Sequence, residues 1–264
     1  MSEVENDVVD CPLLVVREVC KYFDSGLSLT MVLRDISLTI NDGETVAIIG
    51  ESGCGKTALL KTMIRLFKPD SGSVIFDGRD LGELTYFELV QVRTRYGFVF
   101  QQAALFDSMT VGENIAFPLI QHTSKTSAEI NEIVLELLNE VGLSEQILFR
   151  KPAELSGGMR KRVGFARALA LEPEIILYDE PTTGLDPIMS NIINELIINT
   201  HKKHNVTSIF VTHDIKSVFK VASRVIMLYP LAKLNNNESQ IIFDDSPEKL
   251  VNCNDKRVKE FVNV

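Results

Sequence analysis

The stretch Gly50-Glu51-Ser52-Gly53-Cys54-Gly55-Lys56-Thr57 fits the pattern GxxxxGK[ST] of a phosphate-binding loop. An apolar run of strand type, Thr45–Gly50, leads directly into it, and a helical pattern over Lys56–Phe67 follows at once. Glycines allow a tight turn whose successive N–H groups point at phosphate oxygens, and the N-terminus of the helix adds partial positive charge. We therefore predict that this loop binds a nucleoside triphosphate, with Lys56 at the β- and γ-phosphates and Thr57 on Mg²⁺.

Chance gives such a match in roughly one chain of this length per hundred, but the strand before it and the helix after it make coincidence a poor explanation. The pattern tolerates many residues at the position of Cys54, and we expect a small side chain there without a redox role. Together with Cys11, Cys20 and Cys253 it shows no CxxC spacing. The four cysteines therefore indicate reduced thiols rather than disulfides or a metal site.

The composition is that of an ordinary soluble protein: of 264 residues, 45% are apolar and 24% charged, and the formal net charge is −9. An acidic chain does not fit a protein that binds nucleic acid through a broad basic surface. No apolar run reaches the ~18–20 residues that a membrane-spanning helix requires, and the acidic start MSEVENDVVD predicts no signal peptide. We expect a cytoplasmic protein whose contact with a membrane is made through a partner.

Strand-like apolar segments alternate with helical patterns along the chain, which is typical of an α/β fold. The predicted strands are Leu13–Val19, Thr45–Gly50, Ser73–Asp77, Gly97–Gln101, Ile175–Glu180, Ser208–Thr212 and Arg224–Tyr229. The predicted helices are Lys56–Phe67, Ala128–Val141 and Pro187–His201. The alternation breaks between about Gln102 and Phe165, where helical patterns occur without a convincing strand. We interpret that stretch as a mostly helical insertion in one α/β core.

A second strand ends in two carboxylates: the apolar run Ile175–Tyr178 is followed by Asp179 and Glu180. A strand that ends in Asp-Glu usually marks only the solvated start of a loop. In combination with the phosphate loop it predicts the other half of a phosphoryl-transfer site, because hydrolysis needs a metal to spread the developing charge and a group to position the water. We expect Asp179 to hold Mg²⁺ and Glu180 to polarise the attacking water.

Two further strands end in a polar residue, Gln101 after GFVF and His213 after SIFVT. A lone histidine is more often structural or on the surface. At a strand end in the same sheet, His213 could instead donate a hydrogen bond to the γ-phosphate and hold the water in line. The amide of Gln101 could contact Mg²⁺ or that water, and chemistry alone leaves both alternatives open.

The segment Leu155-Ser156-Gly157-Gly158-Met159 resembles the signature LSGGQ of the ABC ATPase family, and it lies between Gln101 and the Asp179–Glu180 pair as that family requires. An isolated LSGG is more often an ordinary loop before a helix. Here it accompanies the other motifs in order, within a resemblance that runs from about Leu13 to the C-terminus. The small residues stand at the start of a predicted helix, so we expect their backbone N–H groups and the Ser156 hydroxyl to form an outward-facing anion site.

The resemblance implies an α/β, P-loop NTPase fold: an ABC-type nucleotide-binding domain with a RecA-like core, an antiparallel β subdomain and a helical subdomain. We expect one domain over residues 1–264, with the core at about 1–101 and 166–264 and the helical subdomain at about 102–165. In this family two copies meet head to tail, and each ATP lies between the phosphate loop of one copy and the signature of the other. The implied cofactors are ATP and Mg²⁺, and hydrolysis reopens the closed pair.

The resemblance also implies roles for single residues. The implied ATP-binding set is Phe23, which stacks on adenine, with Gly50, Glu51, Ser52, Gly53, Cys54, Gly55, Lys56 and Thr57. The implied Mg²⁺ ligands are Thr57, Gln101 and Asp179, and the implied catalytic residues are Glu180, His213 as the switch histidine, and Gln101. Asp186 belongs to the Gly184–Asp186 loop that follows the acidic strand.

Two residues depart from the family pattern. Met159 stands where glutamine is commoner, so backbone contacts to the γ-phosphate are expected to survive. Whether the side chain still contacts the ribose bound by the partner copy stays open at this point. Asp245 stands where a glycine commonly follows the late strand, and we attach no functional consequence to it.

Two longer stretches, FQQAALFDSMTVGENIAFPL at 100–119 and SGGMRKRVGFARALALEPEIILYDEPTTGLDPI at 156–188, are similar to the Mla/Mce-type lipid-transport ATPases of bacterial and chloroplast envelopes. The similarity implies an ATP-hydrolysing subunit that powers phospholipid transport and lies peripherally on the inner or plasma membrane. The implied partners are a second copy of the chain, an integral membrane permease and an Mce-domain lipid carrier, and not nucleic acid.

Several alternatives stay open at this point. In the family, the apolar stretch Ala103–Phe106 with Phe117 belongs to a groove that receives a short helix of the membrane subunit, and the alternative is that these are core side chains. Arg160–Arg162 is expected to be a solvated helix face, with partner docking as the weaker alternative. The other functions considered are a small-solute importer and a regulator of the cell-division type. An ABC ATPase that acts on DNA or ribosomes ranks last, because the chain carries one motif set and no long insertion.

Overall fold

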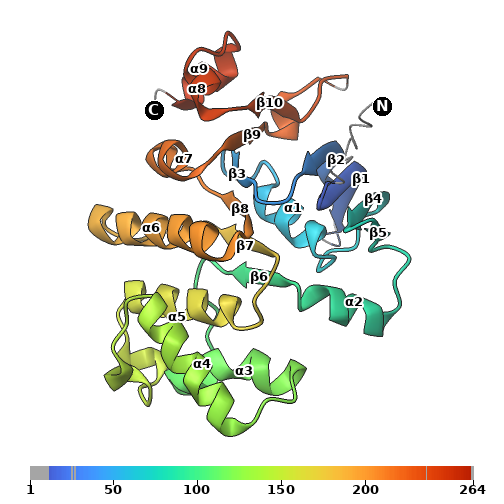
Figure 1. The fold of residues 1–264 in the computed structure, drawn as a ribbon. Helices are drawn as coiled ribbons and strands as arrows, with labels where there is room; N and C mark the ends of the chain where they lie inside the picture. Colours follow the sequence, from blue (N-terminus) through green and yellow to red (C-terminus); the bar gives the residue numbers. More distant parts are fainter. Residues whose placement is uncertain (1–11, 25, 27, 236, 263–264) are drawn as a thin grey trace, which may run out of the picture.

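The apolar runs of the sequence form the strands of a six-stranded sheet in the computed structural model of the protein, which describes residues 12–24, 26, 28–235 and 237–262 (Figure 1). These strands are β3 (Thr45–Ile49), β6 (Tyr96–Val99), β7 (Ile175–Asp179), β8 (Thr207–Val211), β9 (Arg224–Leu228) and β10 (Ile241–Asp245). They lie in the order β10-β9-β3-β8-β7-β6, and all neighbours are parallel except β10, which pairs antiparallel with β9. The strands predicted for this sheet lie within two residues of the observed bounds.

A second sheet is antiparallel throughout and, in the described part of the chain, has the order β2-β1-β4-β5. Its strands are β1 (Leu14–Asp24), β2 (Leu29–Ile40), β4 (Ser71–Phe76) and β5 (Arg79–Asp80). The expected antiparallel β subdomain is therefore confirmed. Strand β2 is missing from the prediction, although buried and exposed residues alternate from Ile36 to Ile40, which is the pattern of a half-buried strand.

Helices pack on both sheets and occupy most connections. Those of the α/β part are α1 (Lys56–Met63), α2 (Tyr86–Arg93), α6 (Pro187–His204), α7 (Ile215–Val221), α8 (Pro247–Val251), α9 (Lys256–Val262) and the short η3 (Leu231–Lys233). Between β6 and β7 lie α3 (Val111–His122), α4 (Ser127–Glu140), η1 (Glu145–Ile147), η2 (Pro152–Glu154) and α5 (Gly157–Leu169), which gather below the sheet in Figure 1. Every element assigned in this connection is helical, so the expected helical subdomain is present.

The same T-x-x-E pattern starts three of these helices. At α2, α3 and α4 a threonine accepts the N–H of the glutamate three residues on, and that glutamate accepts the threonine N–H in return; the pairs are Thr85–Glu88, Thr110–Glu113 and Thr126–Glu129. This capping box satisfies N–H groups that a helix start leaves without a partner. The position of these helices is thus encoded locally in the sequence.

The six-stranded sheet is buried on both faces, which explains its continuous apolar runs. On β3, Ala47 and Ile49 point into one core cluster and Val46 and Ile48 into the other. The first cluster also contains apolar residues of α3, α4, α5 and α6, and the second contains those of α1 and of the antiparallel sheet. Helices α1 and α5 therefore cover opposite faces of the same sheet.

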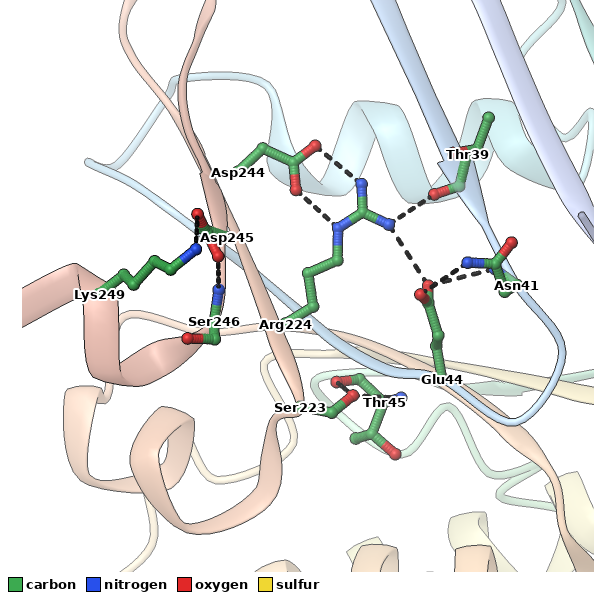
Figure 2. Close-up of polar contacts among 10 residues, drawn as sticks. All are labelled: Thr39, Asn41, Glu44, Thr45, Ser223, Arg224, Asp244, Asp245, Ser246 and Lys249. Carbon is green, nitrogen blue, oxygen red and sulfur yellow. Dashed lines mark hydrogen bonds and ion pairs between the residues drawn. The ribbon is translucent and has the colours of Figure 1, made fainter.

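Arg224 joins four segments at the amino end of β9, as Figure 2 shows. Its Nε and Nη2 donate to the Asp244 carboxylate at 2.6 and 2.8 Å, and its Nη1 donates to the Thr39 carbonyl at 2.9 Å and the Glu44 carboxylate at 3.4 Å. The bidentate geometry of the first pair favours a defined orientation of the guanidinium. The edge hairpin β9–β10 is thereby fastened to the turn between β2 and β3.

Asp245, which replaces a commoner glycine, lies next to this network and has a local structural role. Its carboxylate accepts the N–H of Ser246 at 2.8 Å and the ammonium of Lys249 at 2.9 Å (Figure 2). Both contacts hold the start of α8 against the end of β10.

Other expectations concern the membrane and the cysteines. Among the residues that the structure describes, no helix is long and apolar enough to cross a membrane. Cys20, Cys54 and Cys253 are free thiols. Cys11 and the N-terminal stretch considered for a signal peptide lie outside the described residues.

Candidate active site

The phosphate loop turns through three glycines with positive φ, 142° at Gly50, 80° at Gly53 and 101° at Gly55. A Cβ at Gly50 would overlap the carbonyl oxygen of Leu228, and a Cβ at Gly55 would lie 2.8 Å from the carbonyl oxygen of Val32. Glycine is therefore required at both positions for the conformation and for the close approach of neighbouring backbone.

Lys56 curls back over this loop. Its side chain is 6% exposed, and Nζ donates to the carbonyl oxygens of Gly50 at 2.8 Å and Glu51 at 3.0 Å. Cys54 is also buried, and burial raises the pKa of its thiol. A raised thiol pKa disfavours the reactive thiolate, in keeping with the expected absence of a redox role.

Thr57 and Asp179 come together from α1 and β7. The Thr57 hydroxyl donates to Asp179 Oδ1 at 2.7 Å. Asp179 is 6% exposed, and this burial raises the pKa of its carboxyl, against a smaller lowering by the Thr57 hydrogen bond. A hydroxyl beside a desolvated carboxylate is an oxygen donor set that fits Mg²⁺, because bound cation charge would offset the burial of the carboxylate.

This burial has a consequence for stability. A carboxyl whose pKa is raised by folding stabilises the protein fully only below its unfolded pKa, and that contribution is lost as the pH rises through the folded pKa. We expect Asp179→Asn, which keeps the Oδ1 acceptor for Thr57, to raise the melting temperature of the nucleotide-free protein at neutral pH by about 2–4 °C. Differential scanning fluorimetry at decreasing pH should show the difference shrinking, because protonation removes the buried charge of Asp179. An unchanged or lower melting temperature at neutral pH contradicts this account.

Glu180 is the centre of a polar cluster at the end of β7. Its Oε2 accepts the Thr183 hydroxyl at 2.8 Å and the Gln101 amide at 3.3 Å, and its Oε1 lies 3.5 Å from His213 Nδ1. The structure thus brings together the three residues predicted to be catalytic. Thr183 is missing from the prediction, although it lies only three residues beyond Glu180.

The backbone of Glu180 is also unusual, with a φ of 47°. A non-glycine residue in the left-handed region costs on the order of 1–3 kcal/mol and persists where the surrounding structure holds it. The Glu180 N–H donates to the carbonyl of Val211 on β8 at 3.0 Å, which holds this turn. The strain aims the carboxylate toward the ends of the neighbouring strands.

The predicted strand that ends at Gln101 is wrong at its end, because β6 stops at Val99. Ala103 and Ala104 follow Gln101 with φ of 61° and 47°, a left-handed turn that cannot continue a strand. Arg167 of α5 donates to the carbonyl oxygens of these alanines at 2.9 and 2.8 Å and so holds the turn. Arg167 lies 66 residues beyond Gln101 in the chain, and no local pattern points to the contact.

The signature segment begins α5 on the opposite face of the sheet from α1. Leu155 is 5% exposed and anchors it in the core, while Ser156 and Gly157 are exposed. The Ser156 hydroxyl accepts the N–H of Met159 at 3.2 Å and caps the helix. The side chain of Met159 packs against the core cluster.

The loop after the acidic strand lies against this helix start. The Asp186 carboxylate caps α6 by accepting the N–H groups of Ile188 and Met189, both at 2.9 Å. A Cβ at Gly158 would overlap the side chain of Met189. The N-terminal ends of α5 and α6 are therefore in close contact.

The prediction that Arg160–Arg162 forms a solvated helix face is wrong. Lys161 is 9% exposed, and its Nζ donates to the carbonyl oxygens of Pro181 at 2.8 Å and Thr183 at 2.6 Å. Arg162 donates to the carbonyl of Gly142 at 2.8 Å. These cations are turned inward because irregular loops leave carbonyl groups that need donors.

We expect Lys161→Met to lower the free energy of unfolding by about 1–3 kcal/mol, since the two carbonyl groups lose their donor while buried. Urea unfolding followed by circular dichroism measures this. Lys202→Met, on the exposed face of α6, is the control and should change stability by less than about 0.5 kcal/mol. Equal effects of the two substitutions would contradict a structural role of Lys161.

Phe23 projects from β1, and 36% of its surface is exposed. Its ring meets Phe67 edge to face, with centroids 5.1 Å apart, and Lys21 Nζ lies 5.5 Å from its centroid. This packing holds the ring while leaving part of it accessible, which suits stacking on a base.

The apolar stretch Ala103–Phe106 is expected either to line a groove for a partner helix or to lie in the core, and its residues divide between these two environments. Ala103 is 1% exposed and belongs to the core, whereas Phe106 is 42% exposed. The rings of Phe106 and Phe117 pack in a tilted arrangement with centroids 4.8 Å apart, and the guanidinium of Arg167 lies 5.7 Å from the centre of the Phe106 ring. These residues line an open pocket of about 290 Å³.

Several known proteins are similar to this chain. The family model described as ABC transporter matches residues 33–183. A Mycobacterium tuberculosis protein described as probable ribonucleotide transport ATP-binding protein mkl is 40% identical over 88% of this chain, which spans 62% of that relative's length. The intermembrane phospholipid transport system ATP-binding proteins MlaF of Haemophilus influenzae and Escherichia coli K12 are 38% and 36% identical over 88% of the chain and 84% and 83% of their own lengths.

Solved structures are similar over a comparable share of the chain. The dimeric bacterial ABC transporter cassette MJ0796 matches with a TM-score of 0.80 and 33% identity, covering 89% of this chain and 98% of that one. A dimer of the same cassette bound to ADP and Pi matches with a TM-score of 0.79 at the same identity and coverage.

Proposed function

Because this chain belongs to the ABC transporter family, whose model covers more than half of it, we propose that it is the ATP-hydrolysing subunit of a lipid transporter. The observation that carries hydrolysis is the cluster of Gln101, Thr183 and His213 around the Glu180 carboxylate. The relatives named MlaF, which belong to phospholipid transport systems, support phospholipid or a related lipid as the cargo. The mkl relatives are named for ribonucleotide transport, which makes a small polar solute the second candidate.

In the proposed reaction, Lys56 exchanges its bonds to loop carbonyls for bonds to the β- and γ-phosphates. Thr57, Asp179 and Gln101 would hold Mg²⁺, which supplies positive charge against the phosphate oxygens. Glu180 orients and polarises the attacking water, a task for which its hydrogen-bonded carboxylate is preorganised.

Two exposed side chains, Phe23 and His213, are proposed to contact the adenine and the γ-phosphate at the two ends of the nucleotide. Phe23 stacks on the adenine through its accessible face. His213, whose side chain is 59% exposed, turns from the Glu180 carboxylate to donate a hydrogen bond to the γ-phosphate.

The proposed active unit is a head-to-tail pair of copies. Because α1 and α5 cover opposite faces of one sheet, the signature at Ser156–Gly158 does not meet the phosphate loop of its own copy. The similar cassettes that are dimeric support this arrangement. Each copy is proposed to be one domain, with a core at about 1–101 and 166–264 and a helical subdomain at about 102–165.

The remaining proposal concerns the membrane. The pocket beside Phe106 and Phe117 is proposed to receive a short helix of an integral membrane permease, which would place the chain peripherally on the cytoplasmic side of the membrane. An Mce-domain lipid carrier is the proposed third component of the system. The exposed aromatic pair supports this docking, since a partly open apolar pocket gains stability when a partner covers it.

We expect Phe106→Asp to reduce recovery of the permease with the tagged chain at least about 10-fold, because a charge in an apolar contact costs more than 1.4 kcal/mol. Co-purification from detergent-solubilised membranes measures the recovery, and mass spectrometry of the intact complex identifies the bound lipid or solute. Phe219→Asp is a matched control, since Phe219 on α7 is 43% exposed. Equal recovery with both variants would place the docking surface elsewhere, and a bound ribonucleotide instead of lipid would favour the second candidate.

A further inference from the structure

The chain between β9 and β10 returns to the phosphate loop and contacts it through a buried side chain. Gln240, the residue directly before β10, is 1% exposed. Its Oε1 accepts the N–H of Arg34 at 2.8 Å, and its Nε2 donates to the carbonyl oxygens of Val32 at 3.0 Å and Cys54 at 2.9 Å. A single amide therefore links the end of the β9–β10 connection, strand β2 and the middle of the phosphate loop.

The contact with Cys54 has a direct consequence for the loop. A trans peptide is planar, so the carbonyl of one residue and the N–H of the next point in opposite directions. Fixing the Cys54 carbonyl toward Gln240 therefore fixes the direction of the Gly55 N–H away from it. That N–H belongs to the set that a phosphate loop presents to its anion. Gly55 also lies in close contact with β2, which leaves the Cys54–Gly55 peptide little room to rotate. The hydrogen bond from Gln240 therefore acts on a peptide plane that is already restricted.

A second residue of the same connection acts on the charge of the loop. Lys233 Nζ lies 2.5 Å from Glu51 Oε2, and it lies 5.9 Å from the centre of the Tyr229 ring. The hydrogen bond with Glu51 raises the pKa of Lys233, which favours its charged ammonium form. Without its partner, the Glu51 carboxylate would present negative charge beside a loop that has to receive a polyphosphate.

We propose that Gln240 and Lys233 are positioning residues for the phosphate loop, and that they increase its affinity for nucleotide from outside the sequence motif. Gln240 aims the backbone donors, and Lys233 neutralises the one carboxylate inside the motif. This inference rests on the proposed function, because it presupposes that the loop binds ATP.

The first test compares Gln240→Leu with the unmodified full-length chain. We expect the Kd for ATP, measured by isothermal titration calorimetry, to rise about 10-fold, since two carbonyl groups and one N–H lose their partner. The KM for ATP should rise in parallel, while kcat changes less than about 2-fold, because the groups around Glu180 are untouched.

Arg224→Met is the matched control, because it loosens the other end of the same hairpin (Figure 2). It should lower the melting temperature and leave the Kd unchanged. An unchanged Kd in Gln240→Leu, or equal losses of affinity in both variants, overturns the inference. Absence of ATP binding by the unmodified chain would instead refute the proposed function, so the two failures are distinguishable.

The charge argument has its own test on an exposed pair, which does not depend on folding of the Gln240 variant. Lys233→Met should raise the Kd about 3-fold and Lys233→Arg should leave it near that of the unmodified chain. In a Glu51→Gln background the effect of Lys233→Met should disappear. The same loss in both backgrounds would overturn a role of Lys233 through Glu51.

Discussion

Replacing Glu180 by glutamine is expected to lower ATP turnover about 100- to 10,000-fold while the Kd for ATP stays within about 2-fold. Glutamine has the same size and keeps an oxygen that accepts the hydroxyl of Thr183. It cannot take up a proton or polarise water as a carboxylate does. A phosphate-release assay together with calorimetric titration separates turnover from binding.

The matched control for this variant is Glu174→Gln, at the opposite end of the same strand. Glu174 is paired with Arg95 at 2.5 Å and lies far from the cluster around Glu180 along β7. Its loss should leave turnover near that of the unmodified chain. Retained turnover in Glu180→Gln would contradict the catalytic assignment, and a comparable loss in Glu174→Gln would mean that general destabilisation explains both.

Gly157→Asp is expected to abolish turnover although it leaves its own copy intact. A Cβ at Gly157 has nothing within 4 Å, and an acidic residue in the first turn of α5 favours the helix. Turnover is lost only in the pair of copies, because the new carboxylate would face the phosphates bound by the loop of the second copy and repel them. The melting temperature should therefore be unchanged or higher while turnover falls by at least about 100-fold.

Mixing this variant with Lys56→Ala shows whether the site is shared. Each variant alone has two defective sites per pair, but a mixed pair has one complete site, formed by the loop of the Gly157→Asp copy and the signature of the other. Random pairing at equal amounts should restore about a quarter of the original turnover. Turnover that stays at the level of the separate variants would contradict a shared site, as would robust activity in a variant that cannot pair.

The parts that could be predicted from the sequence are those whose chemistry is local. A few consecutive residues encode the phosphate loop, the Asp179–Glu180 pair and the strands that carry them. A strand shows itself as an alternation of apolar and polar residues or as a continuous apolar run, and neither pattern depends on a residue far away in the chain. The T-x-x-E starts of α2, α3 and α4 belong to the same class. Strand β2 also carries a local signal, the alternation of buried and exposed residues from Ile36 to Ile40, although it is absent from the predicted strands.

What could not be predicted depends on pairs of residues far apart in the chain. Arg167 holds the turn after Gln101, Lys161 supplies a donor to the loop after Glu180, and neither looks different in sequence from a solvated helix cation. Their direction is decided by which carbonyl groups the packing leaves without a partner. Sequence reasoning therefore placed Lys161 on the surface.

The sequence by itself determined the order of the motifs and the α/β arrangement, because an apolar run that ends in a glycine loop or in carboxylates can only place those groups at the carboxyl edge of a parallel sheet. Only the tertiary structure decided that Thr57 meets Asp179, that Glu180 is held by Gln101, Thr183 and His213, and that Gln240 supports the loop 186 residues before it. It also placed α1 and α5 on opposite faces of the sheet. The physical reason is that hydrogen bonds and burial depend on distance in space, which the order of residues along the chain does not contain.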